Sequence, residues 1–211
     1  MKFGFRSRNK YSPKIHPKKS QNFKHLLIGL LFASIFLVQV KDYVYLDNGP
    51  GGYDWKIGKS QLGLFDAYQS RTLMQTRDLA LQLVNRDRQL NGLPPLVEDA
   101  LLSQAAQIHA QDMFVRNYFS HYSPEGKTPT HRLTEVGGKG GAGENIMKQS
   151  SSGDIILSYR LIEEFHKGWM YSPGHRANLL KPEYTHFGYG IMTEPFSRRV
   201  FAVQTFSVSK P

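Results

Sequence analysis

His175 is the residue whose place in the sequence best suits chemistry. It follows Pro173 and Gly174, which predict a tight turn, and it precedes a short helical run that Pro182 ends. A histidine on such a turn is fixed in direction and partly exposed, which suits a ligand or an acid/base group better than core packing. The same residue types are also typical of a turn histidine that caps a helix, and both interpretations stay open on this stretch alone.

Two further candidates, His121 and Glu144, lie near the two ends of a glycine-rich segment. We predict that 120–144 is a loop with a short helix at 130–136, and loops of this length in a compact domain are usually functional. No GxxxxGK[ST] run is present, so the glycines do not predict a phosphate site. Two neutral imidazoles and one carboxylate are a sensible set for Zn²⁺ or another divalent cation, and they could equally act as acid and base.

Three helices are predicted to position these residues. Apolar spacing predicts a helix over 73–91, and a second helix from an Asp99 cap to about residue 117. His109 lies on the apolar stripe of the second helix, and we interpret it as a hydrogen-bonded core histidine rather than a site residue. A third helix is predicted from an Asp154 cap to about residue 169, with Glu163 and Glu164 on its solvated face.

Two strands are predicted after the histidine turn, over 187–192 and 200–208, joined as an antiparallel hairpin. Gly188 and Gly190 alternate with large apolar residues in the first strand, which indicates that another element approaches its backbone closely. Helices on each side of a small antiparallel sheet follow from this order of elements, and the fold class is α+β.

The run from Trp169 to Leu180, WMYSPGHRANLL, resembles the signature of bacterial CAP-superfamily domains, also called SCP domains. This superfamily includes the cysteine-rich secretory proteins, antigen 5 and the plant pathogenesis-related proteins. The resemblance extends in order over roughly Leu73 to Val208. Its other pieces are LVNR at 83–86, GLPPL at 92–96, AA at 105–106, YFSH at 118–121, GENI at 143–146, FGYG at 187–190 and VQTF at 203–206. The resemblance implies a three-layer α-β-α sandwich.

The resemblance also implies that His121, Glu144 and His175 line a central cavity. The fourth cavity position of the family, a glutamate three residues after the tryptophan, falls on Ser172. This departure removes one negative charge and one metal ligand, and it weakens any mechanism that needs two carboxylates. Ser172 lies close to His175 in sequence, but no GxSxG elbow accompanies it, so we interpret it as a helix-end cap rather than a nucleophile.

Four polar neighbours of these residues are predicted to support them. We expect Asn145 and Asn178 to orient the loops through bonds to the backbone. Arg132 and Arg176 could pair with Glu144 or bind an anionic ligand, and a surface ion pair is the alternative interpretation of Arg132.

Most of the net positive charge of the chain lies in its N-terminal segment rather than in the predicted domain. The chain has 211 residues, 40% of them hydrophobic, and a net charge of +10. Residues 1–25 hold eight Lys and Arg and no acid, so the rest of the chain carries only +2. The basic charge therefore predicts no nucleic-acid face. The chain has no Cys, which excludes disulfides and Cys-ligated zinc.

The N-terminal region predicts a membrane anchor. We predict a basic cytoplasmic tail over 1–25, a signal-anchor or transmembrane segment over 26–46, a glycine-rich linker over 47–70 and a CAP/SCP domain over 71–211. The positive flank precedes the apolar run, so the domain is expected on the extracytoplasmic side of the cell membrane, periplasmic or at the cell surface. No small-x-small site follows the apolar run, which favours an uncleaved single-pass anchor over a removed signal.

Together these features favour a membrane-tethered extracytoplasmic binding module over an enzyme. The cleft would contain His121, Glu144, Ser172 and His175, and would take a lipid, glycan or peptide. A divalent metal, Zn²⁺ first among them, would be held by His121, His175 and Glu144. The alternatives are a hydrolase that uses metal-bound water or Glu144 as a base, and a structural envelope protein with a vestigial cavity.

Overall fold

The computed structural model describes residues 46–47, 55–60 and 62–208. The chain divides into two compact units, Met1–Asp42 and Tyr43–Pro211, and the described residues all belong to the second. The predicted tail and anchor, except for Leu46, lie outside the described residues, as do residues 48–54 and 61 of the predicted linker. Within the described ranges, no helix is long and apolar enough to span a bilayer. The anchor therefore stays a prediction.

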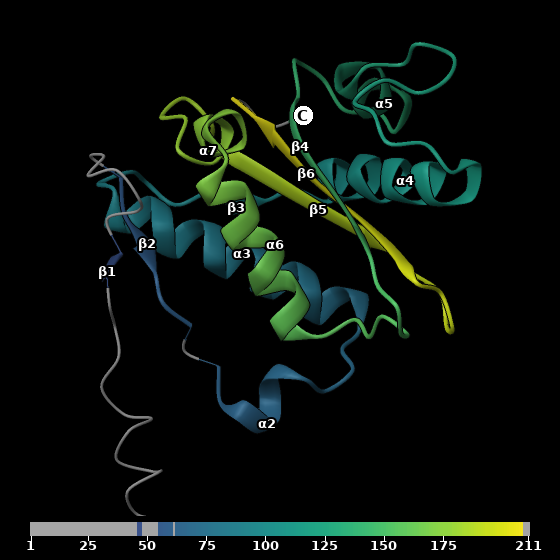
Figure 1. Ribbon diagram of the computed structural model, residues 1–211. Coiled ribbons are helices and arrows are strands. Elements are labelled where there is room, and N and C mark those ends of the chain that lie inside the picture. Colours follow the sequence, from purple (N-terminus) through teal and green to yellow (C-terminus); the bar gives the residue numbers. More distant parts are fainter. Residues whose placement is uncertain (1–45, 48–54, 61, 209–211) are drawn as a thin grey trace, which may run out of the picture. The chain divides into compact units, whose positions relative to one another are not determined.

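The domain has three layers, with a four-stranded sheet between helices (Figure 1). The strands are β3 (Val97–Glu98), β4 (Gly143–Ser150), β5 (His186–Met192) and β6 (Arg199–Ser207), in the order β3-β5-β6-β4. Helix α4 (Ala100–Arg116) packs on one face, and α3 (Leu73–Leu90) and α6 (Tyr159–Tyr171) cover the other. The α+β class and its helix–sheet–helix layering are confirmed.

The sheet is mixed rather than antiparallel throughout, which corrects the prediction. β4, β6 and β5 are antiparallel neighbours, but β3 pairs with β5 in parallel, Val97 opposite His186. A two-residue strand shows no alternation of polar and apolar residues, so no pattern in the sequence predicts it. The strand β4 also differs from the prediction, because the glycines before Glu144 are typical of a loop, whereas Gly143–Ser150 pairs with β6.

The glycines of β5 let α4 lie directly on the sheet, as predicted. A Cβ atom on Gly188 would lie 2.2 Å from the carbonyl carbon of Leu102, and one on Gly190 would lie 2.3 Å from the backbone nitrogen of Gln107. The large residues that alternate with them point to the opposite face, into the core shared with α3 and α6; they are Phe187, Tyr189 and Ile191. One face of β5 thus contacts the backbone of α4, and its other face packs large side chains against α3 and α6.

The helix caps confirm two predictions and correct one. Asp99 caps α4, because its side chain accepts hydrogen bonds from the backbone N–H groups of the first turn, and α3 begins at Leu73 as expected. The third helix begins four residues later than predicted, since Ser158 rather than Asp154 caps α6. Glu164 is exposed on α6, whereas Glu163 is buried, with 1% of its surface accessible, so its assignment to the solvated face is wrong.

The predicted Pro-Gly turn is the first turn of a helix, α7 (Pro173–Leu179), which follows α6 with only Ser172 between them. Proline suits a first helical position because its missing N–H would have no partner there. The expectation of a turn is therefore wrong in form, although it places His175 correctly at an element boundary. The short helix α5 (Pro129–Glu135) matches the predicted one closely.

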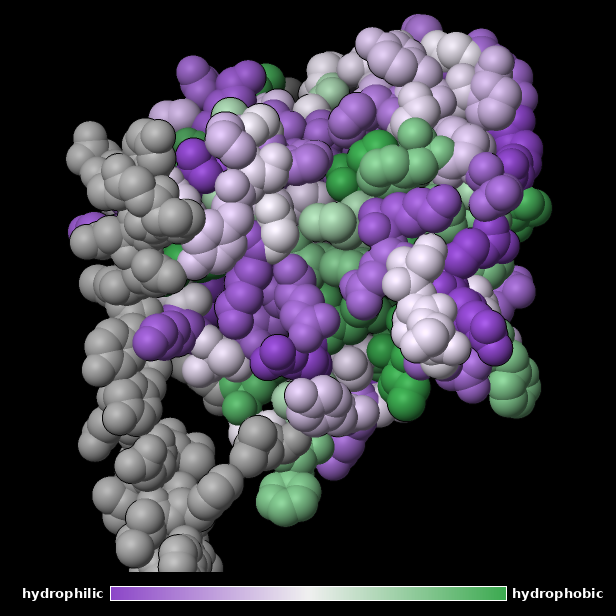
Figure 2. All heavy atoms as spheres, in the orientation of Figure 1, coloured by the Kyte–Doolittle hydropathy of each residue, from purple (hydrophilic) through white to green (hydrophobic). Residues whose placement is uncertain are grey.

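The first described elements lie at the edge of the domain. They are β1 (Leu46–Asp47), β2 (Ile57–Gly58) and α2 (Leu64–Ala67). Phe65 and Tyr68 are 90% and 62% exposed. Figure 2 shows hydrophobic side chains, in green, at the bottom of the view, where Figure 1 places α2. In the described part of the chain, nothing covers this apolar end.

Candidate functional site

The candidate site is built around a buried carboxylate, Glu144, at the start of β4. Only 1% of its side chain is accessible. One carboxylate oxygen, Oε1, lies 2.8 Å from Nδ1 of His121, and the other, Oε2, accepts a hydrogen bond of 2.6 Å from Arg132. Both oxygens are thus engaged by the protein.

Arg132 reaches Glu144 from α5 and is itself buried, with 4% of its side chain accessible. Its guanidinium also donates to the backbone carbonyls of Lys127 and His121, at 2.9 and 3.1 Å. The predicted pairing with Glu144 is confirmed, and the alternative of a surface ion pair is wrong. A buried ion pair with these three hydrogen bonds holds its loop firmly, since removal of either partner would leave a buried charge unmatched.

His121 is held in one direction by this pair. Its Nδ1 faces the carboxylate and therefore carries the proton, while 45% of its side chain stays accessible. A carboxylate behind an imidazole fixes its tautomer and ring orientation and leaves the far nitrogen, Nε2, free for another partner. His121 is therefore a positioned, accessible imidazole.

His175 is held in a similar way by a different group. Its Nδ1 lies 2.9 Å from the hydroxyl oxygen of Ser172, and its backbone carbonyl accepts a bond of 3.1 Å from Asn145. Asn178 donates to the carbonyl of Glu144 and to the side-chain oxygen of Asn145, at 3.1 and 2.9 Å. These amides tie α7 to β4, so the orienting role predicted for both asparagines is confirmed.

The two imidazoles are close enough to affect each other's charge. Burial lowers the pKa of His175, and the neighbouring His121 lowers it further. A neutral His175 is therefore favoured. Arg176, the other predicted partner of Glu144, instead donates to the carbonyl of Met170 and lies over the ring of Trp55.

His109 lies behind the site and is fully buried. Its Nε2 makes a hydrogen bond of 3.0 Å with the carbonyl of Ser120 and lies 3.7 Å from Oε1 of Glu144. Burial is the main cause that lowers its pKa to about 4, with a further contribution from Arg132. The core-histidine interpretation is confirmed, but sequence reasoning missed that this histidine supports the site; its spacing on α4 gave no sign of what faces it.

The predicted metal set is not assembled as a cluster. In the described part of the chain, no group of three or more His, Asp or Glu residues is placed to hold a metal ion. Glu144 is occupied on both oxygens, and Ser172 takes the place of a further carboxylate. Two imidazoles fall short of the three protein ligands of a catalytic zinc site. Among the described residues, the side chains thus offer a metal ion two imidazoles, and the zinc site stays a prediction.

The arrangement also limits acid–base and nucleophilic chemistry. Glu144 is buried and doubly bonded, so it cannot reach a substrate proton as a base without breaking the pair with Arg132. Ser172 contacts His175 as a nucleophile would, yet nothing among the described residues orients Nε2 of that histidine as the third member of a triad does.

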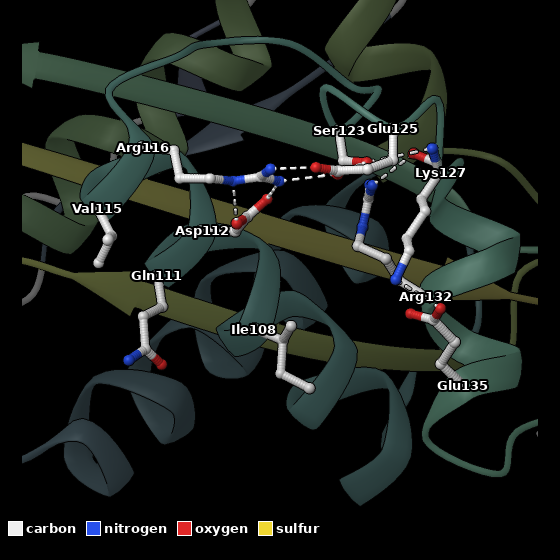
Figure 3. Close-up of a pocket in the computed structure, with 10 residues that line it drawn as sticks. All are labelled: Ile108, Gln111, Asp112, Val115, Arg116, Ser123, Glu125, Lys127, Arg132 and Glu135. Atoms are coloured by element: carbon white, nitrogen blue, oxygen red, sulfur yellow. Dashed lines mark hydrogen bonds and ion pairs between the residues drawn. The ribbon is translucent and has the colours of Figure 1, made fainter.

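A surface pocket of about 340 Å³ lies on the other side of Arg132, against α4 and α5 (Figure 3). Figure 3 shows Arg116 between Asp112 and Glu125, and Lys127 is 2.7 Å from Glu135. The cations that line this pocket are thus paired, and the two imidazoles do not line it. It adjoins the site only through Arg132.

Comparison with known proteins decides the family. The model of the cysteine-rich secretory protein family, CAP, matches residues 81–206, which is more than half of the chain. The chain belongs to this family. The residues matched include every member of the candidate site, His121, Glu144, Ser172 and His175.

Bacterial relatives support the assignment. YkwD of Bacillus subtilis (strain 168) is 40% identical over 111 residues, 52% of this chain and 40% of YkwD. The B. subtilis membrane protein YlbC is 36% identical over 111 residues, 53% of this chain and 30% of YlbC. This chain therefore spans less than half the length of either relative. An extracellular SCP-domain protein of Bacillus anthracis str. Ames has a TM-score of 0.53 and 29% identity, covering 73% of this chain and 46% of that one.

Proposed function

We propose that this CAP-family protein is an extracytoplasmic binding module held at the membrane, and that its ligand is a glycan or a peptide bound at His121 and His175. The observation that carries the proposal is the fixed direction of both imidazoles. Each Nδ1 is engaged by the chain, by Glu144 or by Ser172, and neither Nε2 has a hydrogen-bond partner among the described residues.

The charge balance of the site selects the ligand class. Glu144 and Arg132 neutralise each other, and the lowered pKa of His175 keeps that imidazole neutral near pH 7. The neutral imidazole of His175 suits hydroxyl and amide groups better than it suits a strongly charged ligand or a lipid tail. Phe119 and Tyr122, which flank His121 in sequence, are 47% and 60% exposed and offer apolar surface beside the polar atoms.

The location rests on two supports. The N-terminal sequence predicts an anchor with the domain outside the cytoplasm. One relative is named a membrane protein, and one similar structure is that of an extracellular protein. A reporter fused after Gly52 tests this part, since a cytoplasmic signal would contradict it.

Binding is tested by titrating the protein with chitotetraose, as a glycan probe, and with a short uncharged peptide. We expect one of them to bind saturably, and His121→Ala and His175→Ala each to weaken that binding by about tenfold, the loss of one or two hydrogen bonds. His186→Ala is the matched control, because His186 is a partly exposed imidazole on β5 that bonds to Thr185. Equal binding by all four proteins would refute the site.

The same variants separate the alternatives. A hydrolase would cleave the bound probe and would lose that activity in Glu144→Gln while binding persisted. If no probe binds and neither histidine substitution changes any cellular phenotype, the envelope-structure alternative is favoured instead.

A further inference from the structure

A second polar site lies between α3 and α6, where the sequence predicted only a solvated helix face. A pocket of about 190 Å³ is present there, well above the roughly 10–15 Å³ that a single water molecule needs. It is lined by Leu62, Leu79, Gln82, Leu83, Arg86 and Glu163. Leu62 belongs to the segment that precedes α2, so this segment forms one wall and the two helices form the others.

Glu163 is the unusual member of this lining. It is 1% exposed, and its Oε1 has no hydrogen-bond partner in the part of the chain that the structure describes. A buried polar atom without a partner costs on the order of 1–3 kcal/mol, and a charged one costs more. Such an atom in a folded protein calls for an explanation, such as an ordered water, an ion, a ligand or a chemical role.

Arg86, the only other charged residue of the lining, does not neutralise Glu163. Its guanidinium is bound to Asp87, at 2.7 and 3.1 Å, and donates to the backbone carbonyl of Lys59 at 3.1 Å. Asp87 in turn is bound to His166 at 2.6 Å. Glu163 is therefore the one acid of the lining, and among the described residues it has no ion pair in contact, since Arg160 acts on it only over a longer distance while pairing with Glu164.

We infer that this pocket binds a small aliphatic primary amine, with its ammonium group on the carboxyl group of Glu163 and its hydrocarbon chain against Leu62, Leu79 and Leu83. An ammonium group supplies both missing features, a hydrogen-bond donor and a positive charge. The leucines bury the hydrocarbon chain, which contributes about 0.8 kcal/mol for each methylene group removed from water. The inference is independent of the imidazole site, since no residue is shared.

The test is ligand-observed NMR on the full-length chain in a neutral detergent, with n-butylammonium as the probe and n-butanol as its uncharged counterpart. We expect saturable binding of n-butylammonium, with n-butanol at least about tenfold weaker because it lacks the charge-assisted hydrogen bond. Equal binding of the two probes, or no saturable binding of n-butylammonium in the millimolar range, would overturn the inference. This comparison needs no variant and so does not depend on refolding.

Neighbouring glutamates supply a matched pair of variants. Glu163→Gln should weaken n-butylammonium binding by about tenfold or more, again the loss of a charge-assisted hydrogen bond. Glu164→Gln should leave it unchanged, because Glu164 is exposed and pairs with Arg160 at 2.7 Å. Equal binding by both variants would overturn the inference. Without amine, Glu163→Gln should melt no lower than wild type, and saturating n-butylammonium should raise the melting temperature of wild type but not that of the variant.

Discussion

Two histidine–carboxylate pairs in this domain have almost the same geometry and opposite settings. His121 and Glu144 lie 2.8 Å apart at the surface, and 45% of the His121 side chain is accessible. His166 and Asp87 lie 2.6 Å apart between α3 and α6, and only 1% of each side chain is accessible. A histidine paired with a carboxylate thus gives an accessible imidazole in one region and a buried structural contact in the other.

The difference comes from what surrounds each pair. Asp87 also accepts hydrogen bonds from the backbone of Gly58 and from Arg86, so it joins β2, α3 and α6. Burial alone would raise the pKa of Asp87, but the bonds from His166 and Arg86 outweigh it and lower the pKa. Glu144 carries a buried arginine on one side and an open imidazole on the other. Exposure of the imidazole, rather than the pairing itself, separates a binding group from a structural one.

The largest effect should follow from breaking the sealed pair. Asp87→Asn should lower the free energy of unfolding by about 3–5 kcal/mol, because it leaves the buried His166 and the partly buried Arg86 without their charged partner. Urea unfolding followed by circular dichroism measures this. A change below about 1 kcal/mol would show that the pair is less important to the fold than its burial indicates.

The dependence of folding stability on pH should show the contribution of His109, which belongs to neither pair. Its pKa is lowered from 6.5 to about 4, so between these values the unfolded chain binds a proton that the folded chain does not. Stability should therefore fall as pH falls through this window, by up to about 3 kcal/mol at 1.4 kcal/mol per pKa unit. His175 acts in the same direction, whereas the contribution of Asp87 is lost only below pH 3.8.

The measurement is the free energy of unfolding from pH 7 to pH 4, in wild type and in His109→Gln, which can still donate to the carbonyl of Ser120. The variant should show a flatter profile in this range. An unchanged slope would mean that His109 is not the group that titrates.

The accessible imidazole of His121 should contribute little to the stability of the fold. His121→Ala should cost less than about 1 kcal/mol, because water can replace the imidazole at Oε1 of Glu144 while Arg132 keeps the charge matched. The ratio between this loss and that of Asp87→Asn measures the contrast between the two regions. Unfolding of His121→Ala would remove the distinction on which the proposed site rests.

The smallest effect concerns metal. Two imidazoles without a third ligand should not retain zinc through purification, so wild type and the double variant His121→Ala/His175→Ala should have the same metal content. Elemental analysis measures it. Stoichiometric zinc in wild type that the double variant loses would restore the metal site predicted from the sequence.

The sequence predicted the parts of the fold that have a periodic or local chemical signal. The helices α3 and α4, the cap at Asp99 and the close approach of α4 to Gly188 and Gly190 all follow from such signals. The strands β3 and β4 did not, because two residues show no period and the glycines before Glu144 are typical of loops.

The residues of the site could be predicted from the sequence, but the contacts among them could not. Motif resemblance indicated His121, Glu144, Ser172 and His175, all of which lie together with their asparagine supports. The contribution of His109 and the burial of Arg132 depend on which helix face meets which loop, and neighbours in sequence do not show this. Glu163 and Glu164 make the same point, since adjacent glutamates on one helix point to opposite environments.

The most direct test of the account is the tautomer of His121, measured by long-range ¹H–¹⁵N NMR at neutral pH during titration with the glycan or peptide probe. The account predicts a proton on Nδ1, held by Glu144, and an Nε2 resonance that shifts as the ligand binds. A proton on Nε2, or an Nε2 resonance that stays unchanged at saturation, would contradict it.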